Sequence, residues 1–496
     1  MTRHVRALLC LMLCGLLLTG CTAGNSITPS ATLPPASPGP QAPIGDAGLQ
    51  QEFIAALHLP SLDGQTLLTV YEPLNISRDI HPAQAILEAL FSHPGNSRVQ
   101  PLAEADVLHL SGQDPVEIAG SVCTVNLSPT ALRLSYQELY TAALAISATL
   151  CELEDVSYVC ILAAGTPIAM DVGGNLPLGA LCGPEGQTLP VAWEQFSARR
   201  TVPGELPAHT PLTAAAALYF PLQNGGGIAA EPRRIAFPGQ HPQQQVIALL
   251  EARSAGADTL EGAAPMPDLS SMLLFLPEIT DLESGGRRAT LHFTADVEAR
   301  IAAAGCDPVA VFASVTTTLT TFVPSLQQVC ILVGDGALTT LYSPVLGSCL
   351  FPGGLMTRET FAHTLMGQAT VYRPEGSSLS PVTVGLPYRS AVSQRAVLMA
   401  MAQLGILPAD LTDADVLGLS VQSSTLLVHF SARYAEVIRA SGMDQRMMAY
   451  AMVTTLCEML DVRRVRFYFG GEALDSLGSD LVWSGEFLYN PALISH

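Results

Sequence analysis

Histidines and threonines recur at matching positions in this chain, and both residue types can do chemistry. His292 and His429 lie in the short apolar runs Thr-Leu-His-Phe-Thr and Leu-Val-His-Phe-Ser, and a third such run holds Asn126 at the same place. Imidazole is a common general base and metal ligand. No Asp or Glu recurs at a fixed distance from these histidines. We therefore interpret both as solvent-facing strand positions and not as catalytic residues.

A threonine follows each of these positions, 23 residues after the Asn and 26 residues after each His: Thr149, Thr318 and Thr455. A hydroxyl late in a helix most often bonds to its own helix backbone. We predict that structural role for all three. Tyr71, Tyr219 and Tyr372 also correspond in sequence, each two residues before a Pro. An alternating strand position of this kind favours packing over chemistry.

Four of the eleven cysteines fall at paired positions. Cys160 and Cys330 occupy the same place in two apolar runs, and Cys182 and Cys349 follow matching Leu-Gly dipeptides. The sequence leaves two hypotheses open: disulfides Cys160–Cys182 and Cys330–Cys349, or four small buried thiols. No Cys-x-x-Cys pair is present, so we predict no metal site and no cofactor.

The chain lacks the motifs of common enzyme sites: a nucleophile elbow, His-Glu-x-x-His, a phosphate loop and a dinucleotide fingerprint. We predict a non-catalytic protein. An exported cell-wall-acting enzyme and a solute-binding lipoprotein of a transporter remain alternatives. The net charge is −20 and all 23 basic residues are Arg, without a dense cluster. This acidic balance argues against a nucleic-acid partner.

The N-terminus has the organisation of a bacterial lipoprotein signal. Arg3 and Arg6 precede the apolar stretch 8–18, which is too short to span a bilayer, and Leu-Thr-Gly-Cys follows, ending at Cys21. We predict that residues 1–20 are removed and that Cys21 is lipidated. Residues 21–65 are then the lipidated Cys and a Pro/Ser/Thr-rich spacer. This anchor places the chain on the extracytoplasmic face of the cell membrane.

Internal repeats organise the rest of the chain. From each recurring Thr to the second Val of the next apolar run is 10, 11 or 10 residues. We predict tandem repeats at 66–183, 214–351 and 369–496, with 184–213 as a linker. Helices are expected to begin near Pro82, Pro242 and Ala391, where apolar residues recur at helical spacing.

Each repeat is expected to contain a strand, a helix, two strands, a second helix and one or two further strands. The fold class is therefore α+β: three tandem small domains, each with two helices packed on a small mixed sheet.

This order of elements resembles the GerMN domain family. The resemblance rests on an apolar-Tyr-x-Pro strand, an Arg (Arg78, Arg233 or Arg389), a helix ending in Thr-Leu and a Val-x-x-Val strand that reaches a Gly. The family is named for a lipoprotein of sporulation and spore germination. The resemblance implies three small α+β modules with a structural or partner-binding role in the envelope. Envelope proteins, spore-channel proteins or peptidoglycan are the implied partners. Family members often carry one or two copies, whereas this chain shows three.

Overall fold

The computed structural model describes residues 41–46, 51–76, 82–104, 106–223, 227–283, 285–387, 394–422, 424–460 and 462–495. Residues 42–496 form one compact body. It contains three repeats, which are called the first, second and third units below. Cys21, the signal segment 1–20, Arg78, Arg389 and the expected helix start at Ala391 lie outside the described residues.

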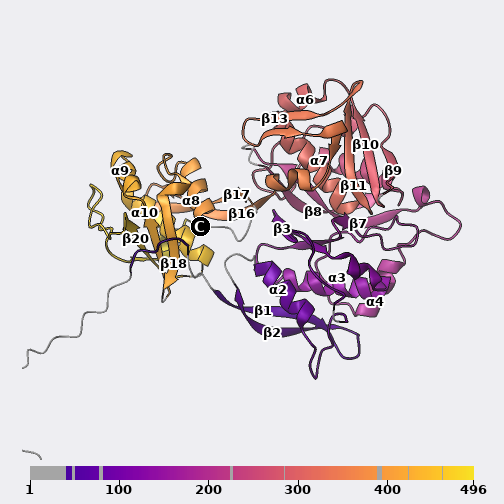
Figure 1. Cartoon of the computed structure of the whole chain (residues 1–496), viewed down its shortest axis with the longest axis horizontal. Coiled ribbons are helices and arrows are strands. Elements are labelled where there is room, and N and C mark those ends of the chain that lie inside the picture. The colour runs from indigo at the N-terminus through magenta and orange to yellow at the C-terminus, as the bar shows by residue number, and fades with distance from the viewer. Residues whose placement is uncertain are drawn as a thin grey trace, which may run out of the picture. The chain divides into compact units, whose positions relative to one another are not determined.

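The first unit begins with a two-stranded hairpin, which Figure 1 shows below α2. Its elements are β1 (Gln51–Pro60), β2 (Leu67–Ile76), α2 (Pro82–Ser92), β3 (Val116–Ala119), β4 (Val122–Leu127), α3 (Tyr136–Leu150), β5 (Tyr158–Ala163) and β6 (Thr166–Pro167). Helix α4 (Leu189–Ser197) follows and packs on α3.

The second unit repeats this order. It has one additional helix between its second sheet strand and its last helix, and three additional short strands at its end. Its elements are β7 (Leu212–Pro221), β8 (Ile228–Phe237), α5 (Pro242–Ser254), β9 (Glu278–Asp281), β10 (Arg287–Phe293), α6 (Val297–Ala303), α7 (Pro308–Phe322), β11 (Leu326–Val333), β12 (Gly336–Ala337), β13 (Thr340–Ser343), β14 (Gly347–Leu350) and β15 (Leu355–Met356).

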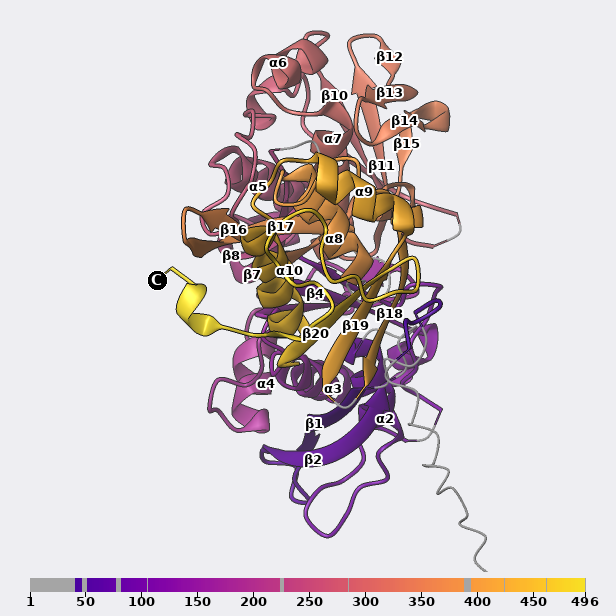
Figure 2. The ribbon, with the colours of Figure 1, turned by 90° about the vertical axis from the view of Figure 1, so that its left-hand side faces the viewer.

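The third unit has the same plan (Figure 2). Its elements are β16 (Met366–Glu375), β17 (Ser378–Pro387), α8 (Gln394–Gln403), β18 (Val416–Gln422), β19 (Thr425–Phe430), α9 (Ala432–Ala440), α10 (Gln445–Leu460), β20 (Arg464–Phe469) and β21 (Phe487–Leu488).

The sheets of the three units share one topology. Their strand orders are β3-β4-β5-β6, β9-β10-β11-β12 and β18-β19-β20-β21, and β15 also pairs with β11. The central pair of strands is parallel in each case, and the outer strands are antiparallel to it. A parallel pair needs a crossover connection, which α3, α7 and α10 provide. The predicted α+β class, with helices on small mixed sheets, is confirmed.

Local sequence explains where the crossover helices begin. Ser135 and Glu138 form a capping box at the start of α3, each side chain bonding the backbone of the other. Asp307 accepts hydrogen bonds from the N–H groups of Val309 and Ala310 at the start of α7, and Pro308 occupies the first helical position.

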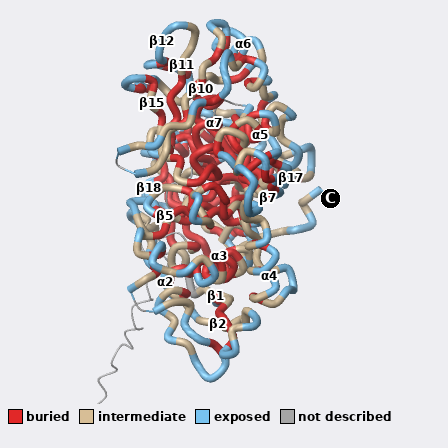
Figure 3. Tube along the Cα trace, turned by 90° about the vertical axis from the view of Figure 1, so that its right-hand side faces the viewer, coloured by how far each residue is buried: buried red, intermediate tan, exposed pale blue. Residues whose placement is uncertain are grey.

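The hydrophobic residues form two separate cores. One core is continuous through the first and second units, and the other fills the third unit. Figure 3 shows the buried chain concentrated around α7, where every residue from Val309 to Phe322 is buried. The first two units therefore fold around a common interior.

One predicted boundary is wrong, and one predicted linker contains a helix. Residues 51–60 were expected to be spacer, but they form β1, which pairs with β2 along its whole length. The segment 184–213, expected to be a linker, contains α4. Each unit also opens with a two-stranded hairpin where a single strand was predicted. The sequence did not reveal the second strand of each hairpin. Because the two strands follow each other directly in the chain, they read as one extended segment.

Candidate functional site

One hydrogen bond between the hairpin and the crossover helix recurs in all three units. The backbone N–H of a residue on β1, β7 or β16 donates to a threonine hydroxyl of the helix. The pairs are His58 with Thr149 at 2.9 Å, Tyr219 with Thr318 at 3.0 Å and Tyr372 with Thr455 at 3.1 Å. The recurring threonines are therefore buried acceptors for a strand, and the prediction that they bond their own helix is wrong.

The same bond corrects the match between the tyrosines. His58 takes the place in the first unit that Tyr219 and Tyr372 hold in the others. Tyr71 lies on the second hairpin strand, β2, with 72% of its surface exposed. The residue type misled the sequence comparison, because the position is defined by its contact with the helix.

In the first and third units, a glutamate three positions after the Thr contacts the side chain of this strand position. In the first unit, His58 Nε2 lies 3.0 Å from Glu152 Oε1. In the third unit, the Tyr372 hydroxyl donates to Glu458, which also accepts from the Tyr489 hydroxyl at 2.6 Å. These contacts strengthen the seam between hairpin and helix.

The second unit uses this position to bind the first unit. Tyr219 is fully buried, and its hydroxyl lies 3.3 Å from Thr124 Oγ1 on β4. Arg358 Nη2 lies 3.5 Å from the same hydroxyl, while its Nη1 donates to Thr321 at 2.5 Å. Arg358 Nε also donates to Glu117 Oε2 on β3 at 2.9 Å. A buried polar cluster therefore joins the two units inside their common core.

Charge pairing keeps the cation of this cluster ionised. Burial lowers the pKa of the Arg358 guanidinium, but the Glu117 carboxylate and Tyr219 raise it by more, so the net pKa lies above its ordinary value. Arg358 therefore stays charged throughout the physiological range, and Glu117 neutralises it.

A cavity of about 270 Å³ adjoins the cluster. Its polar lining includes Glu117, Asn126, Arg358 and Glu359. Glu117 and Arg358 are paired with each other, and the Asn126 amide is engaged at both ends by Ser111 and Gly165. Three of its polar lining residues, Glu117, Asn126 and Arg358, are therefore already used by the fold.

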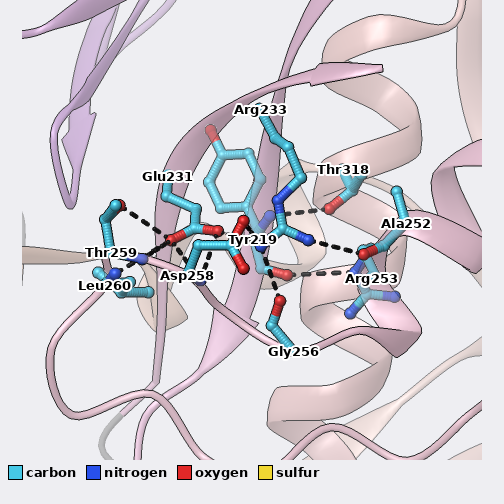
Figure 4. Close-up of polar contacts among 10 residues, drawn as sticks. All are labelled: Tyr219, Glu231, Arg233, Ala252, Arg253, Gly256, Asp258, Thr259, Leu260 and Thr318. Atoms are coloured by element: carbon cyan, nitrogen blue, oxygen red, sulfur yellow. Dashed lines mark hydrogen bonds and ion pairs between the residues drawn. The ribbon is translucent and has the colours of Figure 1, made fainter. Parts of the chain in front are cut away.

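Figure 4 shows a second polar network around Tyr219. The Glu231 side chain on β8 is 3% exposed, and its carboxylate accepts the backbone N–H groups of Asp258, Thr259 and Leu260 at 2.7–3.0 Å. Burial raises the pKa of Glu231, but these donors and Arg233 lower it by more, so the carboxyl is ionised at neutral pH. The loop after α5 is therefore folded onto a buried anion.

Two arginines complete this network. Arg233 pairs with Glu231, lies 3.1 Å from Asp258 and donates to the carbonyls of Ala252 and Gly256. Arg253, 1% exposed, donates to the Tyr219 carbonyl at 3.2 Å and to the Ser314 hydroxyl. Burial lowers the pKa of Arg253 to about 9. Both guanidinium groups bind backbone carbonyls, which is a structural use.

The Asn and His positions also serve the fold. The Asn126 carbonyl oxygen accepts the N–H of Gly165 at 2.8 Å, and His292 Nε2 bonds the carbonyl of Gly334. Both glycines have positive φ, +77° and +56°, in the turn that ends the parallel strand. His429 is only 6% exposed and bonds the carbonyl of Pro43 at 2.8 Å. The expectation that His429 faces solvent is therefore wrong.

The structure has neither of the two hypothesised disulfides. Cys160, Cys182, Cys330 and Cys349 are free thiols, as are the other four cysteines of the described ranges.

The strand register gives the reason in each unit. Val159 pairs directly with Leu181, which leaves Cys160 and Cys182 diagonal to each other, a separation of about 7–8 Å in antiparallel strands. Cys330 is on β11, whereas Cys349 is on the separate β13–β14 sheet. Burial raises the pKa of the Cys160 thiol to about 12.

Within the described ranges, no group of three or more His, Cys, Asp or Glu side chains is placed to hold a metal ion. No single described helix is long and apolar enough to cross a membrane; the bent pair α6 and α7 reaches that length and composition only together.

Sequence reasoning did not find Glu117, Arg358, Glu231 or Arg253. Glu117 and Arg358 are 241 residues apart, and no motif connects them. A long apolar helix in the sequence predicts a buried interface with the sheet. It does not predict which charged residues lie in that interface.

One family model and several solved structures are similar to parts of this chain. Residues 370–475 match the model of the Germane family, described as "Sporulation and spore germination". No curated protein matches.

Solved structures similar to this chain include the tandem GerMN domains of the sporulation protein GerM from Bacillus subtilis, at 19% identity and a TM-score of 0.23, covering 57% of this chain and 92% of that one. The first GerMN domain of the same protein is similar at 17% identity and a TM-score of 0.20, covering 23% and 84%. A putative lipoprotein from Clostridium perfringens is similar at 20% identity and a TM-score of 0.19, covering 29% and 91%.

Proposed function

We propose that this chain is a non-catalytic envelope lipoprotein of sporulation or spore germination. The proposal is supported by the match of residues 370–475 to the Germane family model. The units of the chain serve as a scaffold that binds protein partners or peptidoglycan. Lipid on Cys21 holds it at the extracytoplasmic face of the membrane, and the segment after Cys21 separates the folded units from the bilayer.

One observation carries the non-catalytic proposal: the polar residues that recur in the repeats are engaged in hydrogen bonds within the fold. The three threonines accept strand N–H groups, and Asn126 and His292 hold turns. A catalytic group must instead reach a substrate with the proton or lone pair that these contacts use.

The common core of the first two units supports a scaffold. A binding scaffold benefits from units that cannot shift against each other, because ordering costs at an interface then fall. The buried Glu117–Arg358 pair and the continuous hydrophobic core provide that rigidity here.

The test has a cellular and a biochemical part. Deleting the gene in the spore-forming host is expected to lower the yield of heat-resistant or germinating spores, and a wild-type copy should restore it. Unchanged yields in both assays would contradict the proposed process. Purified protein should release no fragments from peptidoglycan, and release that a single substitution abolishes would show that the chain is an enzyme.

A further inference from the structure

A segment from the beginning of the chain lies on the third unit. Residues 43–46, Pro-Ile-Gly-Asp, precede the first unit in sequence, yet they contact β18 and β19. Strand β18 is the outer strand of its four-stranded sheet, and Figure 1 shows the early part of the chain beside it. The outer edge of β18 therefore has an occupant from within the same chain.

One backbone hydrogen bond and one histidine side-chain hydrogen bond hold this segment against the sheet. The Gly45 N–H donates to the Leu417 carbonyl at 2.9 Å. His429 Nδ1 donates to the Pro43 carbonyl at 2.8 Å, and because a carbonyl can only accept, this ring nitrogen carries the proton. Outer strands expose unpaired backbone groups, and an added peptide commonly satisfies them.

A glycine on the strand makes this close approach possible. A Cβ added at Gly418 would lie 2.6 Å from the Pro43 carbonyl oxygen and 2.7 Å from the Gly45 carbonyl oxygen. Both distances are shorter than real Cβ contacts, and both involve backbone atoms that cannot rotate away. Any other residue at this position would therefore push the segment off the edge.

Asp46 supplies the charged contact. Its carboxylate accepts from Arg395 Nε at 2.7 Å and Nη2 at 3.1 Å, a two-pronged pair, and also from the Leu419 N–H at 3.0 Å. Both side chains of the ion pair are mostly buried, at 22% and 16% exposure. Bidentate Arg–carboxylate contacts are both strong and geometrically selective.

The Ile44 side chain is 90% exposed. Binding thus depends on the backbone of residues 43–45 and on the carboxylate of Asp46. These contacts define the chemistry of the preferred ligand. It is an extended peptide with an acidic side chain placed to reach Arg395.

We propose that the outer edge of β18, with Gly418, Arg395 and His429, is a peptide-binding site, and that residues 43–46 of the same chain occupy it. Through these contacts, the segment that precedes the first unit in sequence is bound to the third unit. A partner carrying a similar acidic extended segment would have to displace it. This inference is independent of the proposed role in sporulation.

Amide hydrogen exchange of the full mature chain tests occupancy. The Gly45 and Leu419 amides should exchange slowly in the wild type. In Asp46→Ala both should exchange at least about tenfold faster, since a lost charged hydrogen bond shifts the equilibrium by that order. Gly418→Ala should release Gly45 in the same way while leaving Asp46 and Arg395 intact.

Two controls separate release from unfolding. Ile44→Ser should change neither amide, because Ile44 is exposed. The Val428 amide, in the centre of the same sheet, should stay protected in every variant. Rapid exchange of Gly45 in the wild type, or equal exchange in wild type and both variants, would overturn the proposal.

A synthetic peptide of residues 41–47 tests the site itself. The peptide should restore slow exchange of the Leu419 amide in Asp46→Ala, and a peptide with Asn in place of Asp should not. Failure of the acidic peptide, or equal effects of both peptides, would rule out a carboxylate-selective site. A dimer of the wild type that Asp46→Ala abolishes in size-exclusion chromatography would show docking onto a second copy, which contradicts the occupant proposed here.

Discussion

The backbone N–H of Tyr372 donates to Oγ1 of Thr455, 83 residues further along the chain, at 3.1 Å. Thr455 is 1% exposed, so water does not compete for this bond. Equivalent pairs in the other two units make this contact the common joint between hairpin and crossover helix.

Removing the Thr455 hydroxyl should therefore destabilise the third unit. Thr455→Val leaves a buried strand N–H without an acceptor, a cost of about 1–3 kcal/mol in the free energy of unfolding. Trp483 is buried in this unit, and its fluorescence in a Trp193→Phe background reports the transition in urea. Thr455→Ser should retain most of the stability, and Thr370→Val, at an exposed position on β16, should have little effect. Equal stability of Thr455→Val and Thr455→Ser would contradict the assigned role.

Breaking the pair between Arg358 and Glu117 should loosen the first two units together. Arg358→Met leaves the Glu117 carboxylate, 15% exposed, without its cation, and such losses cost about 3–5 kcal/mol. Faster amide exchange along α3 and α7 would report it. Arg439→Met breaks a pair with the 70% exposed Glu436 and should cost about 1 kcal/mol or less. If both variants had the same effect, the junction would not depend on this ion pair.

The buried Glu231 carboxylate should make stability depend on pH. Its folded pKa is lowered, so its contribution is present above the unfolded pKa of about 4.3 and is lost as the pH falls through the folded pKa. Glu231→Gln should be less stable than the wild type at pH 7, and the difference should shrink in acid. Urea unfolding at pH 7 and at acidic pH measures this, and a gap that does not narrow on acidification would count against the network of Figure 4.

The cysteines should react as thiols, at rates that follow burial. Cys182 is partly exposed, whereas Cys160 is buried with its pKa raised to about 12. Because the thiolate is the reactive form, alkylation of the folded protein at pH 8 should label Cys182 before Cys160. Mass spectrometry after unfolding without a reductant should find both labelled. Resistance of both to alkylation until a reductant is added would reveal a disulfide.

Lipidation remains a prediction from the sequence. Cys21→Ala should prevent incorporation of labelled fatty acid and release the protein from the membrane fraction, or stall it with residues 1–20 attached. Membrane retention of the wild type without any lipid on Cys21 would contradict it.

The sequence alone determined the parts of this fold that are local. The helical spacing of apolar residues placed α2 and α5 at Pro82 and Pro242, where the structure has them. The recurrence of Thr149, Thr318 and Thr455 located the crossover helices, because a repeated position in a repeated unit marks a repeated contact. Periodicity is a property of residues close together in the chain, so it can be recognised from the sequence alone.

Only the tertiary structure decided which residues meet across the chain. His58 replaced Tyr71 as the partner position because the contact with Thr149 defines it and the residue type does not. No sequence pattern predicted the pairing of Arg358 with Glu117. The two residues are 241 positions apart, and packing of the common core brings them together. The docking of residues 43–46 on β18 likewise depends on an open strand edge and a missing Cβ at Gly418, which exist only once the sheet has formed.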